Sequence, residues 1–355
     1  MKKLIAFLLM TAMVLSLAAC GEKPADDQKP GNDAAVEAEY KLGMGVVVNT
    51  ESSKTGNAQV DATVAAVVTD ADGKIVACRI DVAQNKMAVD GGVVDTAKTF
   101  QTKMELGSAY GMEGKVDNNG DGVMLEWDAQ TKAFEAFVVG KTAAEGRALE
   151  LQEANGHQIA VNEDLLKAGC TIQITDHMEA VAKACEDAKG TSFKTAAAFT
   201  LGVSAATTAE SSTAAAADKD GSVQMYTDFG AAVIDADGKI LAALTDAIQP
   251  KIAINTAGDI IEAAFTGTKR ELGSAYGMEG KVDNNGDGVM LEWDAQSKAF
   301  SDYAVGKTAA DLKAMETQEV NGHFITVDED LLKAGCTIQF TGMSGTIAAA
   351  AEYAR

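Results

Sequence analysis

The chain has few aromatic residues, few cysteines and far fewer basic than acidic residues. Aromatic side chains make up 5% of its 355 residues while hydrophobic residues make up 47%, so alanine, valine and other aliphatic side chains must fill most of the core. The 52 acidic residues outnumber 30 basic ones, and the net charge of −22 disfavours binding to nucleic acid or anionic lipid headgroups. A chain of this length suits two domains of ordinary size.

Motifs of common enzymes and of zinc sites are also missing. Five cysteines are too few for a disulfide-stapled scaffold, and the sequence contains no Gly-x-Ser-x-Gly, His-Glu-x-x-His or Cys-x-x-Cys. Its three histidines have no zinc-ligand spacing, and we expect His157, His177 and His323 to be surface or capping residues. These absences favour a binding or scaffold role over catalysis.

The N-terminus has the organisation of a signal peptide. Lys2 and Lys3 precede an apolar run at residues 4–15, which is too short to span a bilayer. The tetrapeptide Leu-Ala-Ala-Cys follows and ends at Cys20. It resembles the lipobox of bacterial lipoproteins, which implies removal of residues 1–19 and attachment of a diacylglyceryl anchor to Cys20. An ordinary signal peptide with an incidental Cys20 is the alternative.

The lipobox resemblance implies an extracytoplasmic protein anchored to the cell membrane by lipid. Residues 20–39 hold two prolines, several acids and almost no large apolar side chain. We therefore predict that this segment is a disordered tether between the anchor and the folded part of the chain.

The rest of the chain is a tandem repeat. Residues 105–134 and 271–300 are identical except that Thr131 in the first copy is Ser297 in the second. Weaker matches extend in both directions, at an offset of 166 residues downstream and 165 near the first glycine turns. We predict two homologous domains, residues 40–188 and 198–355, joined by a short segment.

The pattern within each repeat predicts an α+β fold with an antiparallel hairpin or sheet followed by several helices. Apolar and polar residues alternate around Asp70-Ala-Asp-Gly73, which predicts a hairpin. Strands come first and helices later, which favours α+β over a wound parallel sheet. The short segment at residues 157–161 follows Asn-Gly and predicts a further strand.

Helices are predicted from periodicity and from their starting residues. Ala97, Phe100 and Met104 recur at helical spacing, as do the apolar residues after Trp127. Capping boxes begin at Thr142 and Thr308, and the last helix of the first repeat is expected to begin at a cap formed by Asp176. Four aromatic residues lie beside the acidic stretches of the repeated blocks, where they are either core anchors or the lining of a ligand pocket; they are Tyr110, Trp127, Tyr276 and Trp293.

Each copy contains the run Asp-Asn-Asn-Gly-Asp-Gly-Val-Met-Leu-Glu-Trp-Asp, whose oxygen-bearing positions match those of a calcium loop. It resembles the dockerin loop, which has Asp at position 12 and leads into a helix. The resemblance implies a weakly bound, structural calcium ion, and a solvated turn is the alternative. The implied ligands of the first loop are Asp117, Asn119, Asp121, the carbonyl of Val123, and Asp128. Those of the second are Asp283, Asn285, Asp287, the carbonyl of Val289, and Asp294.

A second segment, Asp164-Leu-Leu-Lys-Ala-Gly-Cys-Thr171, recurs as residues 330–337. It resembles distantly the flavin-attachment motif of the FMN-binding domain in extracytoplasmic electron-transfer lipoproteins. That resemblance implies Thr171 and Thr337 as the residues that carry FMN. In the alternative interpretation, Gly169 ends a helix and Thr171 enters a strand.

Three functional hypotheses follow. The first is a lipid-anchored surface protein that binds a small ligand and holds structural calcium in its acidic loops. The second is an FMN-binding electron-transfer lipoprotein. The third is a structural or adhesive protein whose duplicated units bind another surface protein, with avidity from the repeat.

Overall fold

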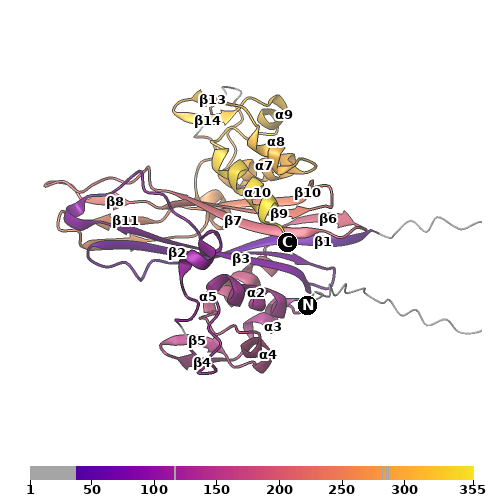
Figure 1. The fold of residues 1–355 in the computed structure, drawn as a ribbon. Coiled ribbons are helices and arrows are strands. Elements are labelled where there is room, and N and C mark those ends of the chain that lie inside the picture. Colours follow the sequence, from indigo (N-terminus) through magenta and orange to yellow (C-terminus); the bar gives the residue numbers. More distant parts are fainter. Residues whose placement is uncertain (1–36, 116, 282, 285, 287) are drawn as a thin grey trace, which may run out of the picture. The chain divides into compact units, whose positions relative to one another are not determined.

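The computed structural model describes Glu37–Arg355 apart from residues 116, 282, 285 and 287. These residues form one compact unit of mixed α/β structure, in which all paired strands are antiparallel (Figure 1). The predicted signal peptide, Cys20 and the tether as far as residue 36 lie outside the described residues. Strand β1 (Ala38–Asn49) begins two residues before the predicted start of the first repeat. Within Glu37–Arg355, and leaving its four gaps aside, no helix has the length and apolarity needed to cross a bilayer.

The first repeat forms a four-stranded sheet in the order β3-β2-β1-β6. Its other strands are β2 (Asn57–Thr69), β3 (Ile75–Ala88) and β6 (Thr191–Thr195). β2 and β3 form the predicted hairpin, because the Asp70 carboxylate accepts hydrogen bonds from the amides of Asp72 and Lys74. Gly73 has a φ of 74° at this turn. β6 belongs to the segment that joins the repeats, so this segment completes the first sheet.

The second repeat forms a sheet in the order β10-β9-β7 and a smaller sheet in the order β12-β11-β8. The turn between β9 and β10 repeats the bonds of the first hairpin, with Asp235 accepting from the amides of Asp237 and Lys239. The strands are β7 (Thr200–Thr208), β8 (Gly221–Val223), β9 (Tyr226–Ile234), β10 (Ile240–Ile248), β11 (Lys251–Ile254) and β12 (Ile260–Ala264).

Side chains of the central strands alternate between two faces, and both faces are buried. On β2, Val64 and Val68 belong to a core cluster that also contains Phe229 and Val233 of β9. The intervening Val67 faces the other way and packs with helices of its own repeat. The inner faces of the two main sheets therefore form one core from both repeats, and an arrangement of two separate domains is not confirmed.

Polar side chains also connect the repeats. The Asn85 side-chain amide on β3 donates a hydrogen bond of 3.0 Å to the Thr207 hydroxyl on β7. Arg270 of the second repeat forms an ion pair of 3.0 Å with Asp187 of the first, and both side chains are largely buried. These contacts lie beside the shared core and fix the register of one sheet against the other.

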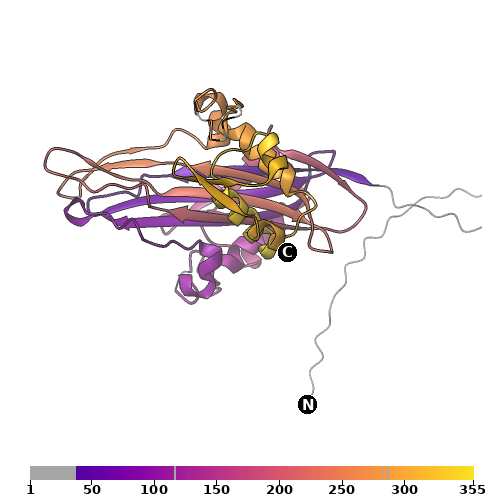
Figure 2. The ribbon, with the colours of Figure 1, turned by 90° about the horizontal axis from the view of Figure 1, so that it is seen from above.

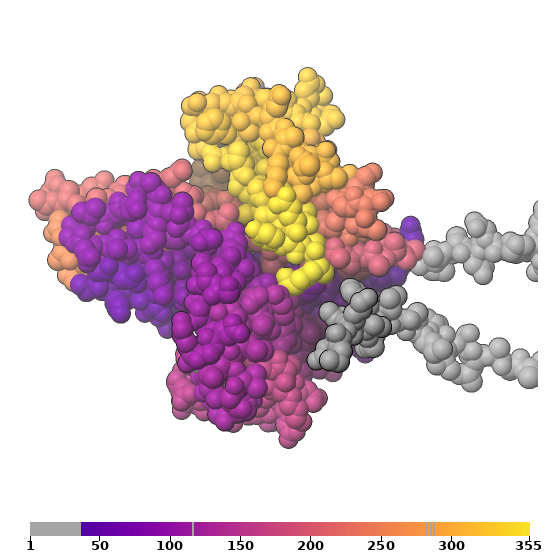
Figure 3. All heavy atoms as spheres, in the orientation of Figure 1, coloured from indigo at the N-terminus to yellow at the C-terminus, as the bar shows by residue number. Residues whose placement is uncertain are grey.

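Helices cover the outer faces of both sheets (Figures 1 and 2). In the space-filling view, the helical segments of the first repeat (magenta) and the second (orange and yellow) occupy separate regions of one face (Figure 3). The first repeat contains η1 (Asp90–Gly92), α1 (Lys103–Leu106), η2 (Gly107–Tyr110), α2 (Trp127–Val138), α3 (Ala143–Arg147), β4 (Leu151–Ala154), β5 (His157–Ala160), α4 (Glu163–Lys167) and α5 (Thr175–Cys185). The second contains α6 (Lys269–Leu272), η3 (Gly273–Ala275), α7 (Trp293–Ala304), α8 (Ala309–Lys313), β13 (Thr317–Val320), β14 (His323–Thr326), α9 (Glu329–Lys333) and α10 (Thr341–Tyr353).

Glycines on the strands let the longest helices lie close to the sheets. α5 packs on β1 and β2, and α10 packs on β7 and β9. A Cβ atom at Gly43 would lie 1.9 Å from the carbonyl oxygen of Ala184, and one at Gly202 would lie 1.8 Å from that of Ala350. Gly43 and Gly202 are equivalent in the two repeats, so the same close approach is built twice.

Local sequence signals predicted several of these elements. The helix that begins at Trp127, the strand at His157 and the capping boxes at Thr142 and Thr308 are confirmed. The prediction of a helix around residues 97–104 is wrong, since only Lys103–Leu106 is helical in this region. Asp176 does not cap α5 either: the cap position is Ile174, and Asp176 lies in the first turn.

Candidate ligand-binding site

The first acidic loop is held by hydrogen bonds among its own residues. The Asp117 carboxylate accepts from the amides of Gly120 and Gly122 at 2.7 and 3.0 Å. The Asp121 carboxylate accepts from the Val123 amide and from the side-chain amide of Asn119. Asp128 is instead in the first turn of α2 and forms an ion pair of 2.6 Å with Lys132.

The second acidic loop repeats the bonds of Asp117, but its position-12 aspartate has a different partner. Asp283 accepts from the amides of Gly286 and Gly288, and Asp294 forms an ion pair of 2.6 Å with Lys189. The predicted ligands Asn285 and Asp287 lie outside the described residues, and Val289 lies in the loop between Gly288 and α7.

In the part of the chain that the structure describes, no three His, Cys, Asp or Glu side chains gather in a way that would hold a metal ion. The loop carboxylates are engaged with loop amides, and the two aspartates at position 12 are paired with lysines. The described residues therefore do not form a ready ligand set. Calcium binding stays a prediction that the sequence pattern alone supports.

Thr171 and Thr337 are fully buried. In each repeat the threonine amide and hydroxyl donate to the side-chain oxygen of a glutamine of the long helix, Gln130 or Gln296, with the amide bond at 2.8 Å. Gln130 also donates to the carbonyl of Leu125, so it joins the acidic loop to the segment after α4. Attachment of FMN at either hydroxyl would require that hydroxyl to become exposed, and the flavin hypothesis stays a prediction.

Gly169 has a φ of 84° just after α4, as expected for a residue that ends a helix. The strand predicted at Thr171 is wrong, because residues 171–174 form an irregular segment that leads into α5. This segment places the start of α5 beside the strands β2 and β3 and beside the end of the acidic loop, where a cavity opens.

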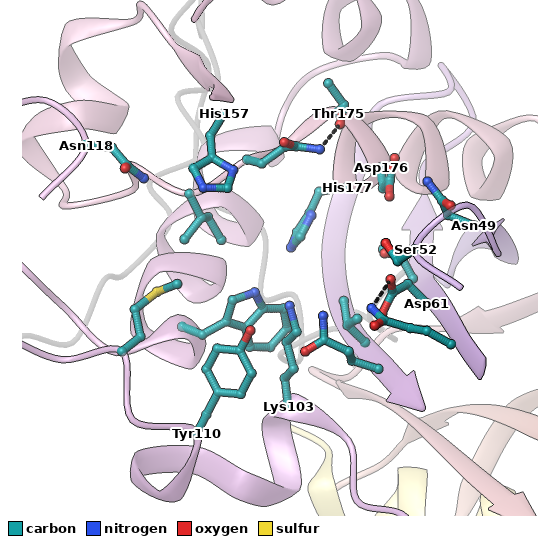
Figure 4. A pocket seen from close by; sticks show the side chains of 18 residues that line it. Asn49, Ser52, Asp61, Lys103, Tyr110, Asn118, His157, Thr175, Asp176 and His177 are labelled. Carbon is teal, nitrogen blue, oxygen red and sulfur yellow. Dashed lines mark hydrogen bonds between the residues drawn. The ribbon is translucent and has the colours of Figure 1, made fainter. Parts of the chain in front are cut away.

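The cavity has a volume of about 410 Å³ and belongs to the first repeat (Figure 4). Strands β1, β2 and β3, helix α1, the aromatic residues beside the acidic loop and the first turn of α5 line it. Asn49, Ser52, Asp61 and Asp176 lie on one side, and His157 and Asn118 lie on another. Because most of the lining comes from regular elements, the cavity is preformed.

His177 projects into this cavity from α5 (Figure 4). Its side chain is only 5% exposed, and neither ring nitrogen has a hydrogen-bond partner in the described residues. The ring lies between aromatic neighbours, with centroids 5.8 Å from Trp127 and 6.0 Å from Phe134. Burial, with a smaller effect from Lys103, lowers the pKa of His177 to about 3, so its imidazole is neutral at ordinary pH. The expectation of a surface or capping histidine is wrong for this residue.

Lys103 provides a cation at the lower edge of the cavity (Figure 4). Its ammonium nitrogen lies 4.9 Å from the ring centroid of Tyr110 and 5.3 Å from that of Trp127. These are cation–π distances. Within the described residues its N–H groups donate to no acceptor, so the cation keeps its hydrogen-bonding capacity for a ligand.

Two carboxylates complete the polar lining. Asp61 on β2 accepts from the side-chain amide of Gln59 at 2.7 Å, but its other oxygen is buried without a partner in the described residues. Asp176 is half-buried in the first turn of α5. Burial and the nearby charge of Asp61 raise the pKa of Asp176, while Lys103 acts in the opposite direction. Asp61, Asp176 and Lys103 are thus close enough to influence one another.

The equivalent region of the second repeat is filled by its own side chains. Tyr226 stands at the position of Asp61, and its hydroxyl accepts a hydrogen bond of 3.0 Å from Lys269, the counterpart of Lys103. Asp228, at the position of Thr63, is buried, and a Cβ atom at Gly342 would lie 2.0 Å from its carboxylate. Met343 takes the place of His177 and is buried.

Among the pocket residues, Asn118 and Trp127 belong to the acidic run, and Tyr110 and Trp127 are among the aromatic residues that the sequence analysis singled out. Asp61, Lys103 and His177 belong to no motif that the sequence alone identifies. Comparison of the repeats position by position would have given a signal, since Asp61, Asp176 and His177 are replaced in the second repeat by Tyr226, Gly342 and Met343. His157 and His323 are exposed, as expected.

No protein-family model matches the chain, and neither a curated protein nor a solved structure matches it.

Proposed function

We propose that this protein is a lipid-anchored, extracytoplasmic binding protein of two homologous units, whose first unit binds a small polar ligand in the His177 pocket. The observation that carries the proposal is the His177 ring, which is buried beside the cavity with both nitrogens unpaired. An unsatisfied buried polar group costs about 1–3 kcal/mol. A ligand that bonds to the ring would remove this cost on binding.

The remaining lining supports the same proposal. The cavity of about 410 Å³ is within the range of about 300–1,000 Å³ that is usual for small-molecule sites. Lys103 and one oxygen of Asp61 also lack hydrogen-bond partners among the described residues. The cavity is therefore lined by both hydrogen-bond donors and acceptors that a ligand can use. The second repeat, in which the same region is filled, serves as scaffold for the shared core.

The proposed location rests on the N-terminal sequence. The signal peptide and Cys20 resemble those of bacterial lipoproteins, and a Cys20→Ala variant should lose the lipid. The measurement is the mass of the N-terminal peptide after purification from membranes. The native chain should begin at Cys20 and carry the mass of a diacylglyceryl group. A chain that begins at another residue, or carries no lipid, would contradict the anchor.

The ligand site can be tested by retention of small molecules. The full chain is incubated with a small-molecule extract, washed and denatured, and the released compounds are identified by mass spectrometry. We expect the wild type to retain a compound that Asp61→Tyr does not, because tyrosine at this position fills the second repeat's pocket. Asp61→Asn, which keeps the size of the side chain, should reduce retention without filling the cavity.

The matched control is Lys141→Met. Lys141 lies 4.3 Å from the ring centroid of Phe137, so it makes a similar cation–π contact outside the His177 pocket. This variant should retain the compound as the wild type does. If Asp61→Tyr folds with a normal melting temperature and retains the same compounds as the wild type, the pocket is not the binding site and the third hypothesis, a structural or adhesive protein, is favoured.

A further inference from the structure

The His177 pocket has charged groups of both signs that are not paired with each other. Lys103 has no ion pair in the described part of the chain, although Asp61 and Asp176 line the same cavity. Asp61 and Ser52 lie beside Asp176 on one side of the pocket, while Lys103 and Tyr110 lie at its lower edge (Figure 4). The pocket is therefore divided into an acidic side and a basic edge.

The acidic side holds two like charges near one another. One oxygen of Asp61 is buried without a partner, and Asp61 raises the pKa of Asp176. Mutual repulsion of two carboxylates in a partly dry site is relieved by a cation placed between them. A primary ammonium group is compact and has three N–H donors, which suits two carboxylates and the neighbouring Ser52 hydroxyl.

The basic edge lacks an anion. In the second repeat, the equivalent Lys269 is buried, donates to the Tyr226 hydroxyl and lies near two buried aspartates, Asp228 and Asp246. The protein itself therefore supplies the hydrogen-bond acceptor and the negative charges near Lys269. In the first repeat Tyr226 is replaced by Asp61, which does not bond to Lys103. A ligand carboxylate at Lys103 would supply the missing acceptor.

In the view of Figure 4, His177 lies above Lys103 and beside Asp176, and its imidazole is neutral. A neutral imidazole has one N–H donor and one nitrogen acceptor. It can therefore accept from an ammonium group and donate to a carboxylate of the same molecule. Trp127 and Met112 provide apolar wall beside it, which limits the ligand to a compact molecule.

We infer that the pocket binds a small zwitterion, with its ammonium group between Asp61 and Asp176 and its carboxylate at Lys103. Free α-amino acids are the simplest members of this class. The inference rests on the proposed function of the His177 pocket as a ligand site, and it adds the chemistry of the ligand.

The test is isothermal titration calorimetry on the full chain with the L-α-amino acids one by one. For the amino acid that binds most tightly, two matched probes follow: the amine that lacks its carboxylate and the carboxylic acid that lacks its amine. We expect the wild type to bind the amino acid roughly ten- to hundredfold more tightly than either probe, as for loss of a hydrogen bond to a charged group.

Two variants assign the ends of the ligand. Lys103→Met should abolish the preference for the amino acid over the amine, because the carboxylate then has no partner. Asp176→Asn should reduce the preference for the amino acid over the carboxylic acid. Each result is a ratio of two affinities measured on the same variant. A general loss of stability lowers both affinities and does not change their ratio. Lys141→Met should leave both ratios unchanged.

Three results would overturn the inference. The first is equal affinity of the wild type for the amino acid and one of the matched probes. The second is that no amino acid binds. The third is that binding occurs but is unaffected by Lys103→Met. If the compound retained in the extract experiment is uncharged and Asp61→Tyr abolishes its retention, the zwitterion inference fails while the pocket itself stands as the ligand site.

Discussion

The two repeats share most of their elements, but the space beside Lys103 is an open polar pocket in the first, whereas Tyr226 and Asp228 occupy the corresponding space beside Lys269 in the second. Both place a lysine over a tryptophan and a tyrosine, at 5.3 and 4.9 Å in the first repeat and at 5.2 and 4.7 Å in the second. Several residues around this lysine differ, and the one that bonds to it in the second repeat is Tyr226, at the position of Asp61. These few positions together determine whether the lysine is satisfied by the protein or left for a ligand.

Closure has an electrostatic consequence in the second repeat. Burial lowers the pKa of Lys269 to about 8, against the opposing effect of Asp228 and Asp246. Burial likewise raises the pKa of Asp228 to about 7. The pKa values of this buried lysine and this buried aspartate therefore both lie close to neutral pH. The open pocket of the first repeat keeps its charged groups partly in water instead.

The largest expected effect comes from exchanging His177 for its counterpart, as His177→Met. The folded-state pKa of His177, about 3, lies below the unfolded value of 6.5, so the unfolded chain binds the proton first on acidification. The stability from a neutral His177 is complete above pH 6.5 and is lost as the pH falls towards 3. Between pH 7.5 and pH 3.5 the wild type should lose about 4 kcal/mol more than the variant.

Urea denaturation at those two pH values measures this difference. The charged groups of Asp61, Asp176 and Lys103 line the same pocket in both proteins, so their contribution largely cancels in the comparison. Equal losses of stability in the two proteins would show that His177 is not buried in its neutral form.

The next largest effect tests what the repeats have in common. Gly43→Ala and Gly202→Ala would each place a methyl group within 2 Å of a helix carbonyl oxygen. We expect each to reduce the free energy of unfolding by about 2–3 kcal/mol, and by similar amounts, because the helix must shift away from the sheet. Gly146→Ala is the control, since nothing lies within 4 Å of its added Cβ. Thermal or urea unfolding that shows no loss for the strand variants would contradict the close packing of α5 and α10.

A smaller effect should follow from Tyr226→Phe, which removes the hydroxyl that Lys269 donates to. A hydrogen bond to a charged group contributes about 1.5–3 kcal/mol, and a water molecule that replaces the hydroxyl would recover part of it. We therefore expect a net loss of about 1–2 kcal/mol in the free energy of unfolding. Tyr110→Phe in the first repeat should change stability by less than about 0.5 kcal/mol, because Tyr110 contacts Lys103 through its ring. Equal effects of the two variants in urea denaturation would remove the distinction between closed and open pockets.

The smallest expected effect concerns the acidic loops, in which the repeats do not differ. If calcium binds with a dissociation constant of roughly 1 mM, about 1 mM calcium should stabilise the protein by about 0.4 kcal/mol per loop, which is about 0.8 kcal/mol for the two loops. Calorimetric melts with calcium and with chelator measure the shift, and the double variant Asp117→Ala, Asp283→Ala should remove it. Asp302→Ala, at an exposed helix position, is the control. Identical melts with calcium and chelator would end the calcium hypothesis.

Local structure was predictable wherever the signal was local. The β2–β3 turn follows from Asp70 and Gly73, and the start of α3 follows from Thr142 and Glu145, because each feature is decided by residues within five positions of one another. The prediction of a helix at residues 97–102 is wrong because apolar periodicity alone does not overcome the unfavourable nucleation of a helix. The segment is largely irregular up to Thr102, where a capping box begins α1.

The shared core was harder to foresee. In an antiparallel sheet with one solvent-exposed face, apolar and polar residues alternate along each strand. Most residues in the second half of β2 are instead apolar on both faces. This pattern indicates that both faces are buried, yet it does not say whether the second covering layer comes from the same repeat. Val64 and Phe229 are 165 positions apart, and no local rule relates them.

The candidate pocket was missed for the same reason. Its polar groups come from β2, α1 and the start of α5, at positions 61, 103 and 177. The sequence drew attention to the acidic loops because twelve neighbouring residues form a compact pattern there. A site assembled by tertiary structure leaves no such pattern, and it becomes visible only when burial and hydrogen bonding are known for each side chain.

The single core between the sheets has a consequence for how substitutions act. A change at Val64 or Phe229 affects both halves of the molecule, since both residues belong to the one core that the two halves share. A change at position 61 or 226 is confined to the outer side of its own half. A duplicated chain of this kind is therefore constrained at its centre and tolerant at its periphery, so that one half can keep its stability while the other acquires a new specificity.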